Sequence, residues 1–260
     1  MLLKFIWYNF SITQRIHILT KKNQILKSII IASTSTIHGS GYLEYLLDEL
    51  KIHFKSTDHI LFIPYARPGG ISHDEYTNIV AKAFSAIGKK VTGIHEFENA
   101  AEAIKQAKGI FVGGGNTFVL VSQLNKNKVL LPIQNAIENG TPYLGTSAGS
   151  NICGLTMNTT NDMPIVYPPS FKTLGLVPFN INPHYLDPIA GSKHMGETRE
   201  TRIKEFHAFN TQPVIGLREG SWIAVKGNNL TLKGPLDARI FEYDKAPYEV
   251  STNSDLGFLK

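Results

Sequence analysis

The feature that most constrains the fold is a regular alternation of short apolar runs with longer amphipathic stretches between residue 28 and about residue 150. The apolar runs, which we predict to be strands, are 28–33, 60–65, 91–94, 109–112 and 142–145. The stretches between them have apolar residues at helical spacing and predict helices at 42–53, 73–86, 100–107, 117–124 and 131–139. Nearly continuous apolar strands joined by helices are typical of a parallel sheet covered on both faces. The sequence therefore predicts an α/β fold with a mostly parallel sheet.

After residue 150 the alternation becomes looser. The elements that we expect there are a helix at 197–208, a strand at 214–217, and a C-terminal β-hairpin of 222–225 and 230–232 around a Gly-Asn-Asn turn at 227–229. Residues 239–243 are expected to extend this hairpin. No repeat, linker or low-complexity stretch divides the chain, so we expect one α/β domain over residues 28–260.

The basic charge of the chain lies at its start. Five of the 26 Lys and Arg residues fall within residues 1–43, which contain no Asp or Glu, and the remaining 21 equal the 21 acids in number. Because the rest of the chain has no net charge, we expect no nucleic-acid partner. Within residues 1–27, the apolar stretch 1–10 is interrupted by Lys4 and lacks the cleavage site of a secretory signal. An organelle transit peptide is the alternative for this basic, acid-free segment, but such peptides are usually richer in Ser and Arg. We expect this segment to be a disordered N-terminal extension.

The cysteine content and the hydropathy pattern limit where the protein acts. The chain has one cysteine, Cys153, so it forms no internal disulfide and has no cysteine cluster for a metal. No apolar run reaches the length of about 18 residues that a membrane helix needs. We therefore expect a cytoplasmic protein with no membrane partner, present as a monomer or a small homo-oligomer.

A Gly-x-Ser-x-Gly motif at 145–149 directly follows a predicted strand. In hydrolases this spacing forms a sharp strand-to-helix turn that exposes the oxygen of a nucleophilic serine, here Ser147. The glycines are required because side chains would clash in such a tight turn. The alternative is an ordinary turn in which Ser147 caps the following helix.

Three glycines at 113–115 also follow a predicted strand and precede a helix. The third glycine of a dinucleotide motif and the Gly-Lys-Ser/Thr end of a phosphate loop are both missing. The amides of Gly114 and Gly115, together with that of Ala148 after the serine, can instead approach a developing oxyanion. A tight turn without catalytic function would also use glycines.

A serine nucleophile needs a base and a group that orients the base. His184 follows an apolar run and a proline, and this position directs its imidazole toward the edge of the sheet where the serine is expected. Two carboxylates are candidates for the orienting group, Asp162 and Glu219, and the spacing does not rank them. The alternative for each carboxylate is that it caps a turn. The alternative for His184 is an ordinary histidine in the core or at its rim.

Taken together, six ordered blocks make the chain resemble peptidase E, the α-aspartyl dipeptidase family of serine peptidases. The blocks are VGGGNTF (112–118), GTSAG (145–149), TTNDMPIV (159–166), INPHY (181–185), GETRE-x-RI-x-E (196–205) and IGL-x-EGSWI (215–223). The resemblance extends from about residue 28 to about residue 235. It implies an α/β fold similar to class I glutamine amidotransferases and hydrolysis of dipeptides that begin with aspartate.

The resemblance also implies roles for individual residues. Ser147 corresponds to the nucleophile and His184 to the base, and both Asp162 and Glu219 are linked to the active site. We favour Glu219 as the residue that orients His184, with Asp162 supporting the site. Arg199, in the GETRE block, is expected to bind the aspartate side chain of the substrate, because guanidinium suits bidentate carboxylate recognition. The mechanism requires no metal or cofactor, and small peptides are the expected partners.

Two other functions fit parts of this pattern. A cyanophycinase-like exopeptidase shares the glycine loop and the serine motif, but the TTNDMP and GETRE blocks favour the dipeptidase. An inactive binding module on the same fold would be expected to have lost the serine, the histidine or both carboxylates, and this sequence keeps all four. A cysteine-dependent amidotransferase is excluded because Cys153 lies six residues beyond the serine.

Overall fold

The computed structural model describes residues 27–188, 191 and 196–259. The predicted extension 1–27 therefore lies outside the described residues, apart from its last residue. In the part of the chain that the structure describes, no helix combines the length and the apolar character needed to cross a bilayer.

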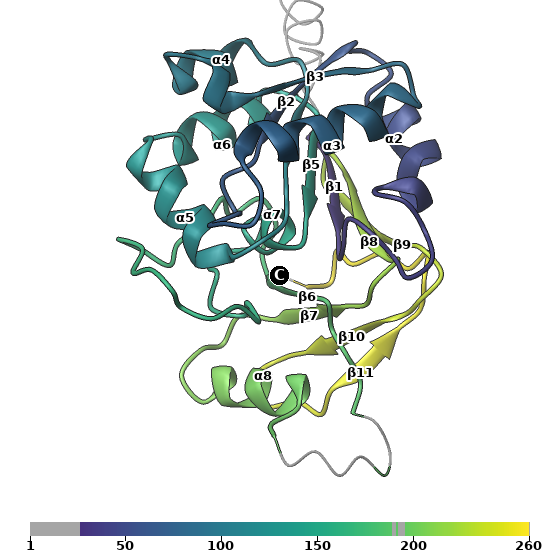
Figure 1. The fold of residues 1–260 in the computed structure, drawn as a ribbon. Helices are drawn as coiled ribbons and strands as arrows, with labels where there is room; N and C mark the ends of the chain where they lie inside the picture. Colours follow the sequence, from purple (N-terminus) through teal and green to yellow (C-terminus); the bar gives the residue numbers. More distant parts are fainter. Residues whose placement is uncertain (1–26, 189–190, 192–195, 260) are drawn as a thin grey trace, which may run out of the picture.

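A seven-stranded sheet with the strand order β3-β2-β4-β5-β1-β8-β9 forms the centre of the molecule (Figure 1). Its strands are β1 (Ser28–Ala32), β2 (His59–Ile63), β3 (Lys90–Gly93), β4 (Ile110–Val112), β5 (Tyr143–Thr146), β8 (Trp222–Lys226) and β9 (Asn229–Lys233). The first five strands are parallel, and β8 and β9 add an antiparallel hairpin beside β1. The predicted parallel sheet and the C-terminal hairpin are confirmed.

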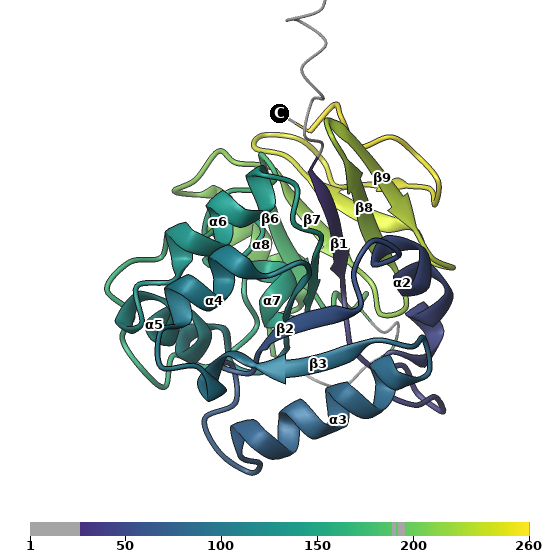
Figure 2. The same ribbon diagram turned by 90° about the horizontal axis from the view of Figure 1, so that it is seen from above.

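Helices cover the two faces of this sheet (Figure 2). They are α2 (Leu47–His53), α3 (His73–Ser85), α4 (Ala100–Gln106), α5 (Thr117–Lys126), α6 (Leu130–Glu138) and the short α7 (Ala148–Asn151). Two 3-10 turns, η1 (Glu44–Leu46) and η2 (Ile94–Glu96), precede α2 and α4. Helix α3 begins with a capping box, in which Ser72 accepts from the Glu75 amide and Glu75 accepts from the Ser72 amide.

Alternate residues of each strand enter two separate hydrophobic clusters. Ile30 and Phe62 pack in the cluster that includes α2 and α3, whereas Ile31 and Ile63 pack in the cluster that includes α4, α5 and α6. Each of these four side chains is at most 1% exposed, and complete burial of such a side chain contributes about 1.5–3 kcal/mol. The unbroken apolar strands of the sequence are explained by this burial on both faces.

A second sheet, with the order β11-β10-β7-β6, lies between the central sheet and helix α8 (Arg199–His207) (Figure 1). Its strands are β6 (Asn180–Pro183), β7 (Val214–Leu217), β10 (Ala238–Phe241) and β11 (Tyr248–Val250). Ile215 on one face joins the main core, while Val214 and Phe241 on the other face pack with Ile203 of α8. One prediction is wrong here: residues 239–243 do not extend the β8–β9 hairpin, because β10 pairs with β7 and β11.

Candidate active site

Ser147 lies in the sharp turn between β5 and α7, with backbone angles of φ 53° and ψ −110°. A positive φ is unfavourable for a residue with a side chain and costs about 1–3 kcal/mol. The turn is tight: a Cβ atom at Gly145 would run into the Gly149 carbonyl, and one at Gly149 would run into the Val112 carbonyl. The hydroxyl of Ser147 makes no capping hydrogen bond to α7, so the helix-cap alternative is not supported.

The Ser147 hydroxyl faces the imidazole of His184. The distance from Ser147 Oγ to His184 Nε2 is 2.8 Å, and His184 Nδ1 lies 2.6 Å from Glu219 Oε1. An ionised carboxylate can only accept a hydrogen bond, so Nδ1 carries the proton and Nε2 is left to accept the serine hydroxyl proton. The His184 and Glu219 side chains are 34% and 46% exposed, so a substrate can reach them.

Two parallel strands of the second sheet bring these residues together. His184 directly follows β6, and Glu219 follows β7 by two residues. Strands β6 and β7 pair in parallel, with Pro183 opposite Leu217, so both strands end at the same edge of the sheet. The site thus combines a serine from the central sheet with a histidine and a carboxylate from the second sheet.

Ser33, which sequence reasoning missed, ties the His184 backbone to the ends of β1 and β7. Its hydroxyl accepts a hydrogen bond from the His184 amide at 2.9 Å and donates one to the Leu217 carbonyl at 2.7 Å. The side chain is completely buried. His184 has a φ of 54°, so this contact holds a backbone in a conformation that non-glycine residues rarely adopt.

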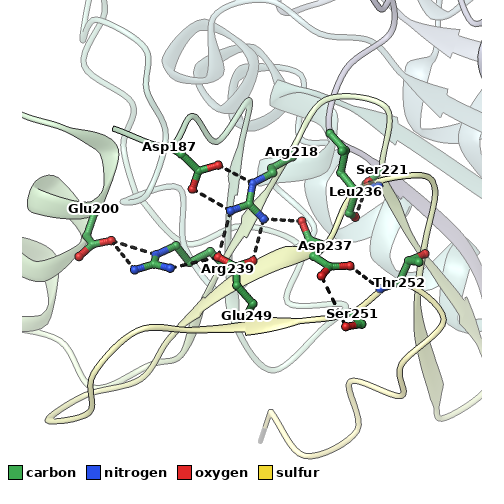
Figure 3. A network of polar contacts seen from close by, with 10 residues as sticks. All are labelled: Asp187, Glu200, Arg218, Ser221, Leu236, Asp237, Arg239, Glu249, Ser251 and Thr252. Carbon is green, nitrogen blue, oxygen red and sulfur yellow. Dashed lines mark hydrogen bonds and ion pairs between the residues drawn. The ribbon is translucent and has the colours of Figure 1, made fainter. Parts of the chain in front are cut away.

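Arg218, the residue before Glu219, is the centre of a polar network (Figure 3). Its guanidinium donates to both carboxylate oxygens of Asp187 at 2.8 and 2.7 Å and to those of Glu249 at 2.8 and 3.0 Å. It also donates to the Asp237 carbonyl at 2.6 Å. Hydrogen bonds to Glu249 and Asp187 raise the pKa of Arg218 above its usual value, so the side chain stays charged.

The same guanidinium lies 5.5 Å from the ring centroid of Tyr185, the residue after His184. Arg218 directly precedes Glu219 in the chain and packs on Tyr185, which directly follows His184. It therefore links the two chain segments that carry the His184–Glu219 pair. Sequence reasoning did not find this arginine, because its five acceptors come from distant parts of the chain.

The glycine loop lies directly against the serine. A Cβ atom at Gly114 would be 2.9 Å from Ser147 Cβ and 3.4 Å from its Oγ, so only glycine fits there. Gly115 has a φ of 143°, and its Cβ would run into the Ala66 carbonyl. Among the described residues, the amides of Gly114, Gly115 and Ala148 donate no hydrogen bond. Amide donors are therefore free beside the serine oxygen.

Asp162 occupies a different position from Glu219. Its Oδ2 accepts hydrogen bonds from the Thr117 amide at 2.7 Å and from the Thr160 hydroxyl at 2.9 Å. Within the described part of the chain it makes no hydrogen bond to His184, and its Oδ1 has no partner. The structure thus places Glu219 on the imidazole and Asp162 at the start of α5, where the glycine loop ends.

Arg199 is the first residue of α8, and its side chain is partly buried. Burial lowers the pKa of Arg199 from its usual value, and so does the charge of Arg202, while the charge of Asp162 opposes this shift. Arg199 is therefore within the range of electrostatic interaction with Asp162. Arg202 forms an ion pair with Glu197 at 3.7 Å.

The described residues include no group of three His, Cys, Asp or Glu side chains that could hold a metal ion. Cys153 is completely buried, and burial raises the pKa of its thiol to about 12. A thiol that stays protonated is a poor nucleophile. The nucleophilic chemistry of the site is therefore left to the serine.

Comparison with known proteins identifies the family. Residues 29–233 match the family described as Peptidase family S51. The chain belongs to peptidase family S51. This membership confirms the family that the six sequence blocks indicated, and with it the predicted class of enzyme, a hydrolase acting on peptide bonds.

Individual members of family S51 resemble the chain over most of its length. It is 46% identical over 236 residues to the "Probable alpha-aspartyl dipeptidase" of Drosophila melanogaster, covering 90% of this chain and 97% of that one. It is 47% identical over 232 residues to "Peptidase E" of Streptomyces coelicolor, covering 89% and 94%.

A solved structure of a putative peptidase E protein from Listeria monocytogenes EGD-e has the same fold. The TM-score is 0.62 at 21% identity, and the match covers 81% of this chain and all of the Listeria chain. A peptidase from an acI-B1 actinobacterium gives a TM-score of 0.65 at 14% identity, covering 90% of this chain and 97% of that one. At these identities the similarity supports the fold alone.

Proposed function

We propose that this S51 peptidase is a serine α-aspartyl dipeptidase, which hydrolyses dipeptides that begin with aspartate. The observation that carries this proposal is the continuous contact from Glu219 through His184 to Ser147, with Oγ–Nε2 and Nδ1–Oε1 distances of 2.8 and 2.6 Å. The name of the Drosophila relative supports the choice of substrate.

In the proposed mechanism, Ser147 Oγ attacks the carbonyl carbon of the N-terminal aspartyl residue while His184 Nε2 takes the hydroxyl proton. Glu219 accepts the Nδ1 proton in a hydrogen bond and stabilises the imidazolium that forms. The free amides of Gly114 and Ala148, with Gly115 beside them, hold the oxyanion of the tetrahedral intermediate. Removing one such donor typically raises the barrier by about 3–4 kcal/mol.

His184 then gives its proton to the leaving nitrogen, the C–N bond breaks, and the second amino acid departs as a neutral amine. Water attacks the remaining aspartyl ester, with His184 again accepting the proton. Loss of the serine oxygen from the second tetrahedral intermediate returns the proton to Ser147 and releases aspartate. No step requires a metal or a cofactor.

We further propose that two charged residues select the substrate. Arg199 binds the side-chain carboxylate of the aspartyl residue through its planar guanidinium. Asp162, whose Oδ1 has no partner among the described residues, pairs with the free α-ammonium group. These roles explain a preference for a short acidic side chain at a free N-terminus.

The test compares hydrolysis of Asp-Leu with that of Glu-Leu, Asn-Leu and N-acetyl-Asp-Leu, using Ser147→Ala as the inactive control and Ser85→Ala, an exposed serine of α3, as the matched control. We expect cleavage of Asp-Leu alone, lost in Ser147→Ala and kept in Ser85→Ala. Activity that survives in Ser147→Ala contradicts the mechanism. A protein that cleaves none of the dipeptides is not an aspartyl dipeptidase.

The role of Asp162 has its own test. Asp162→Asn keeps an oxygen that can accept from the Thr117 amide but loses the charge. We expect it to raise KM for Asp-Leu with a smaller change in kcat. An unchanged KM would show that Asp162 only holds the glycine loop.

We also propose that the protein acts in the cytoplasm, where small peptides arise from protein turnover. A single buried cysteine is compatible with such a reducing compartment. Fractionation of cells that make the protein tests this location.

A further inference from the structure

A second cation borders the glycine loop on the side of β2. Arg67 follows β2 by four residues, its side chain is exposed, and its guanidinium lies 5.1 Å from the ring centroid of Tyr76. Within the described residues Arg67 forms no ion pair, whereas Arg202, Arg218 and Arg239 all do. An exposed arginine held on a ring and left without a carboxylate is available for a ligand.

A chain of contacts connects Arg67 to the serine. The Tyr76 hydroxyl donates a hydrogen bond to the Gly114 carbonyl at 3.2 Å. A Cβ atom at Gly114 would lie 2.9 Å from Ser147 Cβ. Arg67 is therefore separated from the nucleophile by one tyrosine side chain and one glycine, on the β2 side of the site.

The Tyr76 ring under Arg67 is itself held by hydrogen bonds. The Tyr42 and Tyr76 hydroxyls lie 3.3 Å apart, and since Tyr76 gives its proton to Gly114, Tyr42 is the donor. Burial raises the pKa of Tyr42 well above its usual value, and the charge of Arg67 opposes this rise, so the guanidinium is close to this hydroxyl as well. The hydrogen bonds of the Tyr76 hydroxyl to Gly114 and Tyr42 thus hold the Tyr76 ring in place beneath the arginine.

The geometry of a guanidinium allows stacking and carboxylate binding at the same time. Its flat face packs on an aromatic ring, while the N–H groups at its edge point outward and match a carboxylate in a bidentate arrangement. In a dipeptide, three bonds separate the scissile carbonyl carbon from the carbon of the C-terminal carboxylate, a distance of about 4 Å. A carboxylate that close to the reacting bond must lie at the rim of the active site.

The charges of the substrate and of the site can be compared. An aspartyl dipeptide with a neutral second residue has two carboxylates, one on the aspartate side chain and one at the C-terminus. Among the described arginines, two form no ion pair. Arg67 lies near the glycine loop, and Arg199 lies near Asp162. Arg199 is assigned to the side chain, and Arg67 is left for the C-terminus.

We propose, on the basis of the dipeptidase function above, that Arg67 binds the free C-terminal carboxylate of the substrate. It thereby favours peptides with a single residue after the scissile bond. A longer peptide or a C-terminal amide presents no charge at this position and loses the contact.

The experiment measures kcat and KM for Asp-Leu and for Asp-Leu amide with wild-type protein, Arg67→Ala and Lys82→Ala. Lys82 is an exposed cation on α3, the helix that also carries Tyr76, and serves as the matched control for loss of one positive charge. Charge-assisted hydrogen bonds of this kind give a discrimination of about 10- to 100-fold. We expect wild type and Lys82→Ala to prefer Asp-Leu over its amide by that factor in kcat/KM.

In Arg67→Ala we expect the preference to disappear, through a higher KM for Asp-Leu and unchanged kinetics with the amide. An equal loss on both substrates would overturn the proposal, because Arg67 would then only support Tyr76 and the glycine loop. A lost preference for Asp-Leu over Asn-Leu would also overturn it, because Arg67 would then bind the side chain. If wild-type protein cleaves no aspartyl dipeptide, the dipeptidase function fails, and this proposal fails with it.

Discussion

Ser33→Ala is the substitution that tests most directly whether the backbone of His184 must be held in place. The Ser33 hydroxyl has two partners, the His184 amide and the Leu217 carbonyl. The Leu217 carbonyl keeps a second hydrogen bond, from the Tyr185 amide at 3.1 Å. The substitution therefore leaves one partly buried group without a partner, the His184 amide.

The expected loss of stability follows from that single orphaned donor. A buried N–H without a partner costs about 1–3 kcal/mol, and in a protein of this size each kcal/mol lowers Tm by about 2–4 °C. The effect on activity is separate. Because His184 has a φ of 54°, its backbone relaxes when the contact is lost and the imidazole moves away from Ser147. A displacement of about 1 Å can reduce the rate about 100-fold.

The assay compares kcat for Asp-Leu and Tm of the wild type, Ser33→Ala and Thr57→Ala. Thr57 is a buried residue whose hydroxyl bonds the His59 amide and carbonyl at 3.2 and 2.9 Å, just before the start of β2 and so at the opposite end of that strand from the glycine loop. We expect both variants to lose stability, but only Ser33→Ala to lose kcat, by about 10- to 100-fold. If Ser33→Ala keeps kcat within about twofold of wild type while Tm falls, the hydroxyl stabilises the fold and does not position His184.

Three further predictions concern the site and the core. Glu219→Gln offers an amide N–H to Nδ1 and so favours the wrong imidazole tautomer; we expect kcat for Asp-Leu to fall about 10²- to 10⁴-fold with little change in Tm, and an unchanged kcat would contradict the orienting role. Gly114→Ala places a Cβ 2.9 Å from Ser147 Cβ, so steady-state kinetics should show a kcat about 100-fold lower, whereas full activity would mean that the loop moves freely. Burial lowers the pKa of His53 to about 4, below its unfolded value of about 6.5. Between these two pKa values, His53 binds more protons in the unfolded chain than in the folded protein. Neutral His53 therefore makes its full contribution to the free energy of unfolding above about pH 6.5, and this contribution is lost as the pH falls toward 4. In urea titrations, the free energy of unfolding should fall between pH 7 and pH 4 by roughly 3 kcal/mol less in His53→Gln than in wild type. An identical fall in both proteins would refute the assignment of this pH dependence to His53.

The central sheet could be predicted from the sequence because each of its parallel strands is buried on both faces. Strand β6 has the opposite character: Asn180 and Asn182 lie inside it, fully or almost fully buried. The Asn180 side chain bonds Thr156 through both its oxygen and its nitrogen, and the Asn182 Nδ2 donates to Thr159 and Asn161; these partners belong to the preceding loop. Polar residues that pair across a loop leave no hydrophobic periodicity, so the strand was missed.

The sheet to which a strand belongs is equally hidden from local patterns. Residues 238–241 alternate like a strand of the hairpin, but their partners are β7 and β11. In the same way, the spacing of Asp162 and Glu219 did not decide which one meets His184. That choice depends on the register of β6 and β7, which puts Pro183 opposite Leu217.

The candidate site was predictable where a backbone requirement leaves its mark on the sequence. Gly145 and Gly149 identify Ser147 because no larger residue fits around the turn. Ser33 and Arg67 leave no such mark, since a serine or an arginine is compatible with almost any position. Their contacts exist only between segments that are far apart along the chain.

The division of the site between two sheets has a consequence for synthesis on the ribosome. Ser147 is made directly after the five parallel strands of the central sheet, whereas His184 comes 37 residues later and Glu219 72 residues later. At 5–20 residues per second, the interval from Ser147 to Glu219 is about 4–14 s of translation. Until β6 and β7 have formed and docked, the serine hydroxyl has no partner to take its proton. The serine therefore stays inactive in the nascent chain, and peptidase activity reports the docking of its last parallel strand pair.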